Sequence, residues 1–461
     1  MPLLQTTQAS YPPGPPPVGK NPLTQLRFGL YVTKNPLGVM MDWFQTYGDM
    51  VHLQFGDTNH VYLLSNPTHI HEVLVEKADQ FHKAAKYKDE QRGLARLLGN
   101  GLITSDGDYW RQQRRLMQPA FHARRIEGYG VVMVNYTRQM LDSWRDGSSL
   151  DVADEMMHLT LAIVARTILD TELAGDAEQI AEAVSVFQNL AFGVDIFPLW
   201  LPTPAHIRQS RVEKTMSQII SRLIAERRAS AGDRGDLLSM MLLTIDEEGN
   251  GMTDRQIRDE MVTLFLAGHE TTANALNWAW YLLAQHPDIE AKLHSELDAV
   301  LQGNPPTFAD LKRLPYTEMV MKEAMRLYPP VWSMSRQVIE AVEIGGYPIA
   351  KGSEVNIITY ATHHDSRWWS EPECFLPERF SPQQEQQFPK LAYLPFSSGP
   401  RVCIGNSFAM VEAQLILATI AQRYRLALTD GYNTQPEALI TLRPQHGLPM
   451  KVQRRELLLK P

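Results

Sequence analysis

Residues 253–286 carry the longest helical pattern in the sequence, and this pattern limits the possible folds most. Thr253 is of a type that caps helix N-termini, and Pro287 ends the pattern because proline cannot continue a helix. At about 1.5 Å per residue this helix would be roughly 50 Å long, enough to cross a whole domain. Its most apolar part, residues 261–283, contains Glu270, so we interpret it as a buried helix and not as a membrane span.

The rest of the chain is mainly helical in pattern, with short strands. From residue 67 to 243, apolar residues recur at intervals of three and four. Residues 50–64 and 342–357 predict hairpins around glycine turns. The start of the chain, residues 1–20, contains YPPGPPPVG and predicts a stiff extended segment. The sequence therefore predicts a mainly α fold with small β-sheets, in which residues 21–461 form a single domain.

Composition excludes several classes of protein. The 461 residues are 44% hydrophobic and 21% charged, as in ordinary globular proteins. The formal net charge of -8 argues against nucleic acid as the main partner. Two cysteines are too few for a disulfide framework or a four-cysteine zinc site, and they suit a reducing cytoplasm. No run approaches about 20 apolar residues and the start lacks a signal-peptide pattern, so we expect a cytoplasmic protein without an integral membrane anchor.

Residues 396–405 read FSSGPRVCIG and place Cys403 just before the start of a predicted helix. Gly399, Pro400 and Gly405 force a tight, irregular backbone around it. Backbone N–H groups and a helix N-terminus stabilise a thiolate, which predicts a lowered cysteine pKa. Such a sulfur can bind iron and favour O–O cleavage in haem enzymes. The alternative is an inert buried cysteine in a glycine turn.

Residues 267–272 read AGHETT and lie midway along the long predicted helix. An acid beside a hydroxyl is what proton delivery to dioxygen requires. Gly268 lacks a side chain, so the helix can lie against a flat cofactor and open locally. One alternative is a core kink whose polar groups are satisfied. Another, a zinc hydrolase, fails: His269 and Glu270 begin an H-E-x-x-H pattern, but position 273 is Ala.

These segments together resemble the cytochrome P450 family, and the resemblance spans nearly the whole chain. The pattern F-x-x-G-x-R-x-C-x-G of residues 396–405 is similar, position for position, to the cysteine loop of that family. The resemblance implies that Cys403 is the axial ligand of the iron of haem b, that Arg401 pairs with a haem propionate, and that Phe396 packs beside the sulfur. Further residues implied to bind the cofactor are Ala267, Ile404 and Gly405.

The resemblance also implies roles for residues outside the cysteine loop. Glu270 would be the acid and Thr271 the hydroxyl relay of oxygen activation. Trp110 and Arg114 lie at i and i+4 of a predicted helix and would together hold one propionate, while Arg336 would hold the other. Without the cysteine loop, an amphipathic surface helix would be the better explanation of Trp110 and Arg114.

A structural triad is a further implication of the resemblance. Glu323 and Arg326 lie three residues apart on one helix face, and the later segment 377–380 reads PERF. Such ion pairs are commonplace on surfaces, but this combination resembles the triad of the family, formed here by Glu323, Arg326 and Arg379. We expect a buried network that stabilises the fold and retains haem. The family fold is a triangular helical prism with a small β-rich subdomain.

Function and partners follow from the same resemblance. We expect a monooxygenase that uses O2 and acts on an apolar substrate. The sequence has no G-x-G-x-x-G unit and no length left for a flavin module, so electrons would come from a separate ferredoxin or flavodoxin-type donor with its reductase. A basic cluster would meet this donor, unless it is merely a solvated face: Arg114, Arg115, Arg124 and Arg125. The alternatives are a peroxygenase or isomerase on the same scaffold and a non-catalytic haem sensor.

The expected substrate pocket is apolar. By position it would draw on the segment before Trp110, residues 187–201, residues 331–334 and the turn near Ile440 and Thr441. These stretches offer the apolar side chains Phe187, Leu190, Phe192, Phe197, Trp200, Leu201 and Trp332. Little charge accompanies these side chains, so an apolar ligand is expected, such as a fatty acid, a terpenoid or a carotenoid. The pattern alone inclines us toward a medium or long aliphatic chain.

Overall fold

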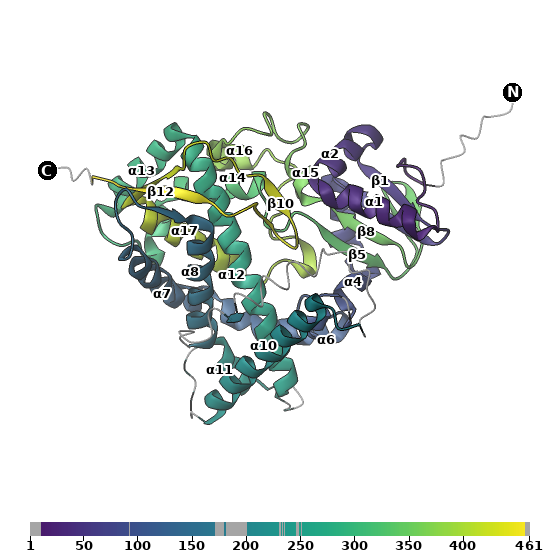
Figure 1. The fold of residues 1–461 in the computed structure, drawn as a ribbon, viewed down its shortest axis with the longest axis horizontal. Helices are drawn as coiled ribbons and strands as arrows, with labels where there is room; N and C mark the ends of the chain where they lie inside the picture. Colours follow the sequence, from purple (N-terminus) through teal and green to yellow (C-terminus); the bar gives the residue numbers. More distant parts are fainter. Residues whose placement is uncertain are drawn as a thin grey trace. The chain divides into compact units, whose positions relative to one another are not determined.

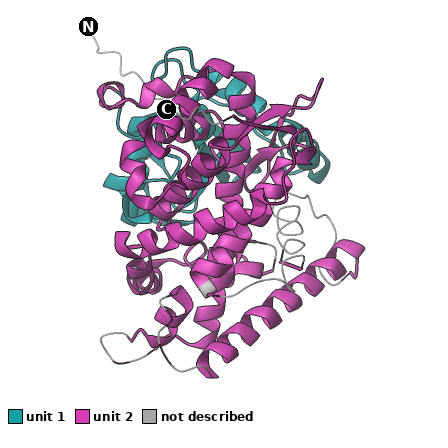
Figure 2. Ribbon diagram, turned by 90° about the vertical axis from the view of Figure 1, so that its left-hand side faces the viewer, with its two compact units in different colours: residues 1–85, 332–372, 388–402 teal, residues 86–331, 373–387, 403–461 magenta. Residues whose placement is uncertain are grey.

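The structure is a computed structural model that describes residues 11–91, 93–170, 179–180, 201–229, 232, 234, 236–245, 249 and 251–456. The chain divides into two compact units, which Figure 2 shows in teal and magenta. Unit 1 comprises residues 1–85, 332–372 and 388–402, and unit 2 comprises residues 86–331, 373–387 and 403–461. Each unit is therefore assembled from segments that are distant in the sequence.

Unit 1 contains a five-stranded sheet. Its strands, in spatial order, are β1 (Met50–Phe55), β2 (Asn59–Leu64), β8 (Glu354–Ile357), β5 (Met334–Val338) and β3 (Phe81–Lys83). β2 and β8 pair in parallel, and the other pairs are antiparallel. The hairpin predicted at residues 50–64 is confirmed, and Gly56 adopts the positive φ of its turn (+62°).

The second predicted hairpin is confirmed only in its first part. β6 (Val342–Ile344) and β7 (Tyr347–Ile349) pair around Gly345 and Gly346. β8 instead leaves this hairpin and pairs with β2 and β5. Its register buries Val355 and Ile357 in the core of the larger sheet, which the short ladder of β6 and β7 could not do.

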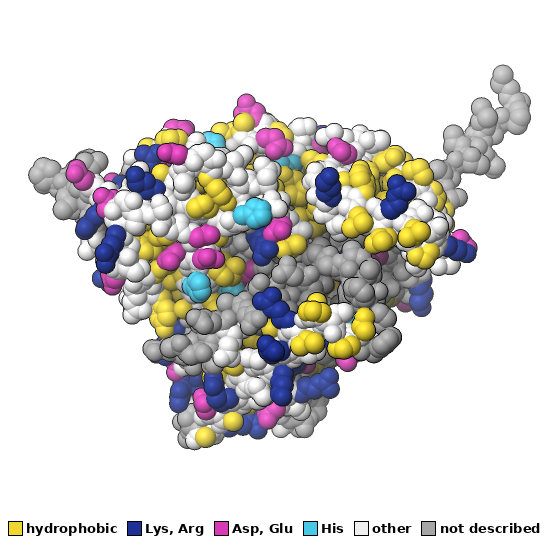
Figure 3. Space-filling view, in the orientation of Figure 1, with side chains coloured by type: hydrophobic (Ala, Val, Ile, Leu, Met, Phe, Trp, Pro, Cys, Tyr) yellow, Lys and Arg dark blue, Asp and Glu magenta, His cyan; other side chains and the backbone are white. Residues whose placement is uncertain are grey.

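The remaining elements of unit 1 flank this sheet. Its helices are α1 (Pro22–Lys34), α2 (Pro36–Tyr47), α3 (Pro67–His71), the π-helix η1 (Glu72–Glu76), the short 3-10 helices η2 (Ala78–Gln80) and η6 (Gly399–Arg401), and α15 (Thr359–His363). The proline-rich segment 11–19 contains no helix. It is hydrogen-bonded to β1, where the Val18 N–H donates to the Gln54 carbonyl at 2.8 Å. α1 has no buried residue, and apolar and basic side chains cover the region of this helix in Figure 3.

Unit 2 is built around α12 (Asp254–Gln285), which confirms the long helix (Figure 1). Thr253 and Gln256 form a capping box at its start, and Pro287 opens the next helix. α12 packs most extensively against α8 (Val152–Leu169), and also against α14 (Pro315–Leu327), α10 (Pro204–Ala229) and α17 (Asn406–Ala421). Because neighbours surround it, α12 is buried on nearly every face.

Further elements complete unit 2. Its other described helices are α5 (Ala95–Leu98), α6 (Gly107–Met117), η3 (Gln118–Phe121), α7 (Ala123–Leu141), α11 (Leu237–Leu243), α13 (Pro287–Leu301), η4 (Phe308–Arg313), η5 (Pro377–Phe380) and α16 (Pro382–Glu385). One small sheet joins β4 (Ser149–Asp151), β12 (Pro449–Arg454) and β9 (Tyr424–Leu428), and another joins β10 (Pro436–Ala438) and β11 (Leu442–Pro444). α4 (Ala85–Lys88) begins in unit 1 and continues in unit 2. The mainly α class with small sheets is confirmed. Among the described residues, no helix has the length and apolar character needed to span a membrane.

Candidate functional site

Cys403 lies in unit 2, three residues before the first residue of α17. Its side chain is exposed, although protein surrounds the position closely enough that burial raises the pKa of the thiol. The backbone N–H of Gly405 and the positive charge of Arg114 act in the opposite direction and lower it. The predicted net lowering of the pKa is therefore wrong for the thiol alone, because the effect of burial exceeds that of the Gly405 N–H and of Arg114 together. A metal ion that coordinates the sulfur would remove the proton outright.

Trp110 and Arg114 come together on α6, one turn apart. Trp110 is buried, and the guanidinium carbon of Arg114 lies 5.8 Å from the centre of the indole ring. Burial lowers the pKa of Arg114, and the electrostatic influence of Cys403 raises it. The structure thus brings an exposed thiol and a half-buried guanidinium within electrostatic reach of each other.

The middle of α12 presents one accessible strip in a helix that is otherwise buried. Between residues 261 and 283, every side chain is buried except Ala267, Gly268 and Thr271. The Thr271 hydroxyl donates to the Ala267 carbonyl at 2.8 Å. A Cβ on Gly268 would approach a methyl group of Val164 to 3.2 Å, so close packing against α8 also favours glycine here. Small residues and an open strip at this position suit a flat cofactor such as the predicted haem.

Glu270 lies on the same helix but points into the protein. It is 2% exposed, and the Thr441 hydroxyl donates to its Oε1 atom. Thr441 is in the turn between β10 and β11, and its oxygen accepts a hydrogen bond from Asn274 Nδ2 at 3.0 Å. The acid is thereby bonded to a turn that lies 171 residues away in the sequence.

The side chain of His269 is packed inside the protein and does not belong to the accessible strip of α12. It is fully buried, its Nδ1 atom contacts the Phe265 carbonyl, and burial lowers its pKa to about 4. The Thr160 hydroxyl of α8 donates to the His269 carbonyl at 3.0 Å. In the part of the chain that the structure describes, no cluster of three or more His, Cys, Asp or Glu side chains could hold a metal ion. The neutral, buried imidazole suits packing between α8 and α12.

Glu323, Arg326 and Arg379 form one buried network between α14 and η5. Arg326 donates to both carboxylate oxygens of Glu323, at 2.7 and 2.8 Å, and Arg379 donates to one of them at 3.2 Å. The Leu376 N–H adds a further bond to Glu323 at 3.0 Å, and Arg326 reaches the Cys374 carbonyl at 3.1 Å. Glu323 and Arg326 are fully buried, so this network differs from a surface ion pair.

The other predicted cofactor residues are distributed between the units. Ile404 and Gly405 follow Cys403 in unit 2. Arg336, Phe396 and Arg401 belong to unit 1, where Arg336 is buried on β5 and donates to the neighbouring Ser335 carbonyl at 2.9 Å. Gly399 lies between Phe396 and Arg401 in the loop of unit 1, and a Cβ there would lie 1.9 Å from the Leu74 carbonyl oxygen. Packing against η1 therefore requires this glycine.

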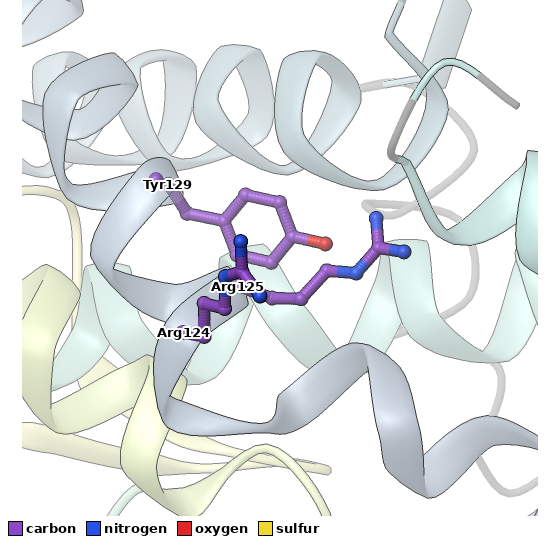
Figure 4. A pocket seen from close by; sticks show the side chains of 4 residues that line it. Arg124, Arg125 and Tyr129 are labelled. Atoms are coloured by element: carbon purple, nitrogen blue, oxygen red, sulfur yellow. The ribbon is translucent and has the colours of Figure 1, made fainter.

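The basic cluster lies on α6 and α7. Arg115 and Arg124 are exposed, and Arg114 and Arg125 are half-buried. A pocket of about 540 Å³ adjoins the start of α7, and Figure 4 shows its labelled lining residues Arg124, Arg125 and Tyr129 projecting from that helix. Two guanidinium groups and a phenol at one pocket can bind carboxylates or other anions.

Sequence reasoning missed Glu412, a carboxylic acid inside α17. It is fully buried, and burial raises its pKa to about 8. The nearby Thr272 opposes this shift, but its hydroxyl donates to the Gly268 carbonyl at 3.2 Å. Neither carboxyl oxygen of Glu412 has a hydrogen-bond partner among the described residues. An acid in the middle of an apolar helix, nine residues after the cysteine, was a signal that could have identified it.

The turn near Ile440 and Thr441 was expected only as part of the substrate pocket. The hydrogen bonds that link Thr441 to Glu270 and Asn274 were not predicted, because these residues become neighbours only in the folded chain. The predicted substrate-lining residues 187–200 lie outside the described residues. Of the other two, Leu201 is half-buried and Trp332 is 4% exposed.

Comparison with known proteins gives consistent results. A family model described as Cytochrome P450 matches residues 12–450. Cyclooctatin synthase of Streptomyces melanosporofaciens is 38% identical over 420 residues, covering 90% of this chain and 90% of that protein. Pentalenene oxygenase of Streptomyces avermitilis is 33% identical over 413 residues, covering 89% and 91%. The crystal structure of the cytochrome P450DA heme domain superposes with a TM-score of 0.86 at 26% identity, covering 98% of this chain and 99% of that one.

Proposed function

This chain belongs to the cytochrome P450 family and is a haem-dependent monooxygenase; we propose that it inserts one oxygen atom of O2 into a cyclic terpenoid, with electrons from a separate donor protein. The reaction is R–H + O2 + 2e⁻ + 2H⁺ → R–OH + H2O. The single observation that carries this proposal is the environment of Cys403. Its thiol is exposed, accepts a hydrogen bond from the Gly405 N–H and lies close enough to Arg114 to feel its positive charge.

Haem b, when bound, supplies the iron at which O2 is activated. Cys403 would ligate this iron, and Ala267, Ile404, Gly405 and Phe396 would line the porphyrin. Trp110, Arg114, Arg336 and Arg401 would hold the two propionates, because guanidinium groups bind carboxylates in a bidentate geometry. The strip formed by Ala267, Gly268 and Thr271 leaves room for a flat group beside α12.

Glu270 and Thr271 would manage the protons of the reaction. Thr271 lies on the accessible strip, where its hydroxyl can reach a substrate or an ordered water molecule. Glu270 is adjacent and buried, so it can store a proton out of contact with bulk solvent. The presence of this acid and hydroxyl pair favours monooxygenation with O2 over a peroxygenase or isomerase, which takes oxygen already present in its substrate.

The electron donor would be a ferredoxin or flavodoxin-type protein with its own reductase. Arg115 and Arg124 are exposed on neighbouring helices, and Arg125 and Tyr129 line the pocket of Figure 4. A basic surface of this kind suits an acidic partner by charge complementarity. Residues 21–461 would act as a single haem domain in the cytoplasm, where the free thiols of Cys374 and Cys403 remain reduced.

The substrate class follows from the relatives. Two of them are named for the terpenoids cyclooctatin and pentalenene. We therefore favour a cyclic terpenoid over the aliphatic chain to which the aromatic pattern alone inclined. Cyclic terpenoid hydrocarbons and alcohols should shift the haem absorption band to shorter wavelength at micromolar concentration. A panel in which only fatty acids produce this shift would contradict the proposed substrate.

Replacement of Cys403 by Ser tests the proposal at its foundation. The reduced wild-type protein should show, under carbon monoxide, the red-shifted Soret maximum of a thiolate-ligated haem, and Cys403→Ser should abolish it. Cys374→Ser is the matched control, because Cys374 is the other exposed cysteine, and it should leave the spectrum unchanged. An unchanged spectrum in Cys403→Ser would contradict the assignment.

A further inference from the structure

Three buried side chains form a hydrogen-bonded chain between α12 and the turn that joins β10 to β11. Asn274 Nδ2 donates to Thr441 Oγ1 at 3.0 Å, and the Thr441 hydroxyl donates to Glu270 Oε1. Asn274, Thr441 and Glu270 are 1%, 4% and 2% exposed. Glu270 and Asn274 are four residues apart on α12, so both face the same turn.

The direction of these hydrogen bonds follows from the chemistry of the groups. A hydroxyl has a single proton but can accept hydrogen bonds at its oxygen. Because the Asn274 amide fills an acceptor position of Thr441, the Thr441 proton is directed to the carboxylate. The bond therefore favours one orientation of the Glu270 side chain.

The turn that carries Thr441 is itself held in place. Trp278 Nε1 of α12 donates to the Leu442 carbonyl at 3.0 Å, and the Leu442 N–H donates to the Pro330 carbonyl at 2.9 Å. Ile440, on the other side of Thr441, packs against the apolar cluster that includes Leu264 of α12. Both neighbours of Thr441 are thus anchored, so its hydroxyl has a defined position relative to α12.

We propose that Thr441 is a positioning residue for the acid of this enzyme: it holds the Glu270 carboxylate in the orientation from which a proton is delivered. This inference rests on the proposed function of Glu270. Without the Thr441 hydroxyl the carboxylate turns to other partners, fewer protons arrive in time, and more of the electrons taken from the donor are lost to peroxide instead of appearing in product.

A double-mutant cycle tests the proposal. Thr441→Val, which keeps the shape and removes the hydroxyl, should lower product formed per NADPH roughly three- to tenfold, the scale expected for neighbours that share a hydrogen bond. Thr441→Ser restores the hydroxyl and should restore the ratio of product formed to NADPH consumed, which we call coupling. In a Glu270→Gln background, where the acid is already absent, Thr441→Val should have little further effect. Thr137→Val controls for the loss of a buried threonine hydroxyl, because Thr137 bonds only the Met133 carbonyl of its own helix in the described structure.

Thermal unfolding of the four proteins of the cycle (wild type, Thr441→Val, Glu270→Gln and the double variant) provides a second readout that does not depend on turnover. Thr441→Val should lower the unfolding midpoint more in the wild-type background than in Glu270→Gln, because it removes the hydrogen bond to the carboxyl group only in the first. Unchanged coupling in Thr441→Val, or an equal loss in both backgrounds, would overturn the proposal. Failure of the proposed function would look different: the wild-type protein would oxidise no substrate, while the thermal cycle would still report the contact between Thr441 and Glu270.

Discussion

Thr271 and Thr272 are adjacent residues that differ in one decisive respect. Both hydroxyls donate to the carbonyl four residues earlier, at 2.8 and 3.2 Å. Thr271 belongs to the accessible strip of α12, whereas Thr272 is 3% exposed and lies near the buried Glu412. Only Thr271 can therefore exchange a hydrogen bond with a ligand beside the helix.

Replacing each threonine by Ala should separate these roles. Thr271→Ala should reduce product per NADPH several-fold and raise peroxide, because the hydroxyl that relays the proton is lost. Thr272→Ala, the matched control, should change thermal stability more than coupling. Both are measured as the ratio of product and of peroxide to NADPH consumed. Equal coupling in the two variants would remove Thr271 from the proton relay.

Glu412 should make stability depend on pH. Its pKa is about 8 in the folded chain, against an ordinary value of 4.5. Between these values the folded state holds a proton that the unfolded state has lost, so this group makes stability fall as pH rises from about 4.5 to about 8. Glu412→Gln should flatten the decline of the unfolding midpoint across this window. Glu127→Gln, which removes an exposed carboxylate of α7, controls for net charge; an unchanged slope in Glu412→Gln would contradict the prediction.

At the scale of elements, the network between α14 and η5 should contribute far more to stability than a surface ion pair. Glu323→Ala leaves two buried arginines without this carboxylate and should cost about 3–5 kcal/mol of unfolding free energy. Arg313→Ala removes an exposed pair with Asp310 (3.3 Å) and should cost about 0–1 kcal/mol. Denaturant unfolding measures both variants. Similar losses would show that burial does not determine the contribution of this network.

α6 and α7 together should determine how fast the donor delivers electrons. Arg115→Glu and Arg124→Glu should each slow reduction by the donor and weaken its dependence on ionic strength, because exposed charges steer association. Arg222→Glu, an equal charge change on α10, is the control. Stopped-flow reduction across a range of salt concentrations measures the effect. Rates that match the wild type would show that this basic cluster is only a solvated face.

At the scale of the whole molecule, two compact units are each assembled from separated segments. If residues 21–461 act as one haem domain, calorimetry of the haem-loaded protein should show a single cooperative transition. Removal of haem should lower its midpoint by several degrees, because a ligand that binds only the folded state stabilises it. Two separate transitions in the loaded protein would contradict the proposal of one domain.

Local signals in the sequence were sufficient for the bounds of α12 and for the hairpin of β1 and β2. Thr253 and Pro287 act on the backbone within a few residues, and the turn at Gly56 depends on its own φ. Such features depend on short-range sterics and hydrogen bonds, so they can be predicted without knowing what packs nearby.

Contacts between groups that are distant along the chain could not be predicted from local patterns. β8 left its predicted hairpin because pairing with β2 and β5 buries its apolar side chains, and the thiol of Cys403 has a raised pKa because desolvation outweighs its favourable neighbours. The bond from Thr441 to Glu270 joins residues 171 positions apart. Short-range patterns were enough to locate the long helix and to select the candidate acid, hydroxyl and thiol. Their burial and their partners come from packing, because both depend on the summed contacts of segments far apart along the chain.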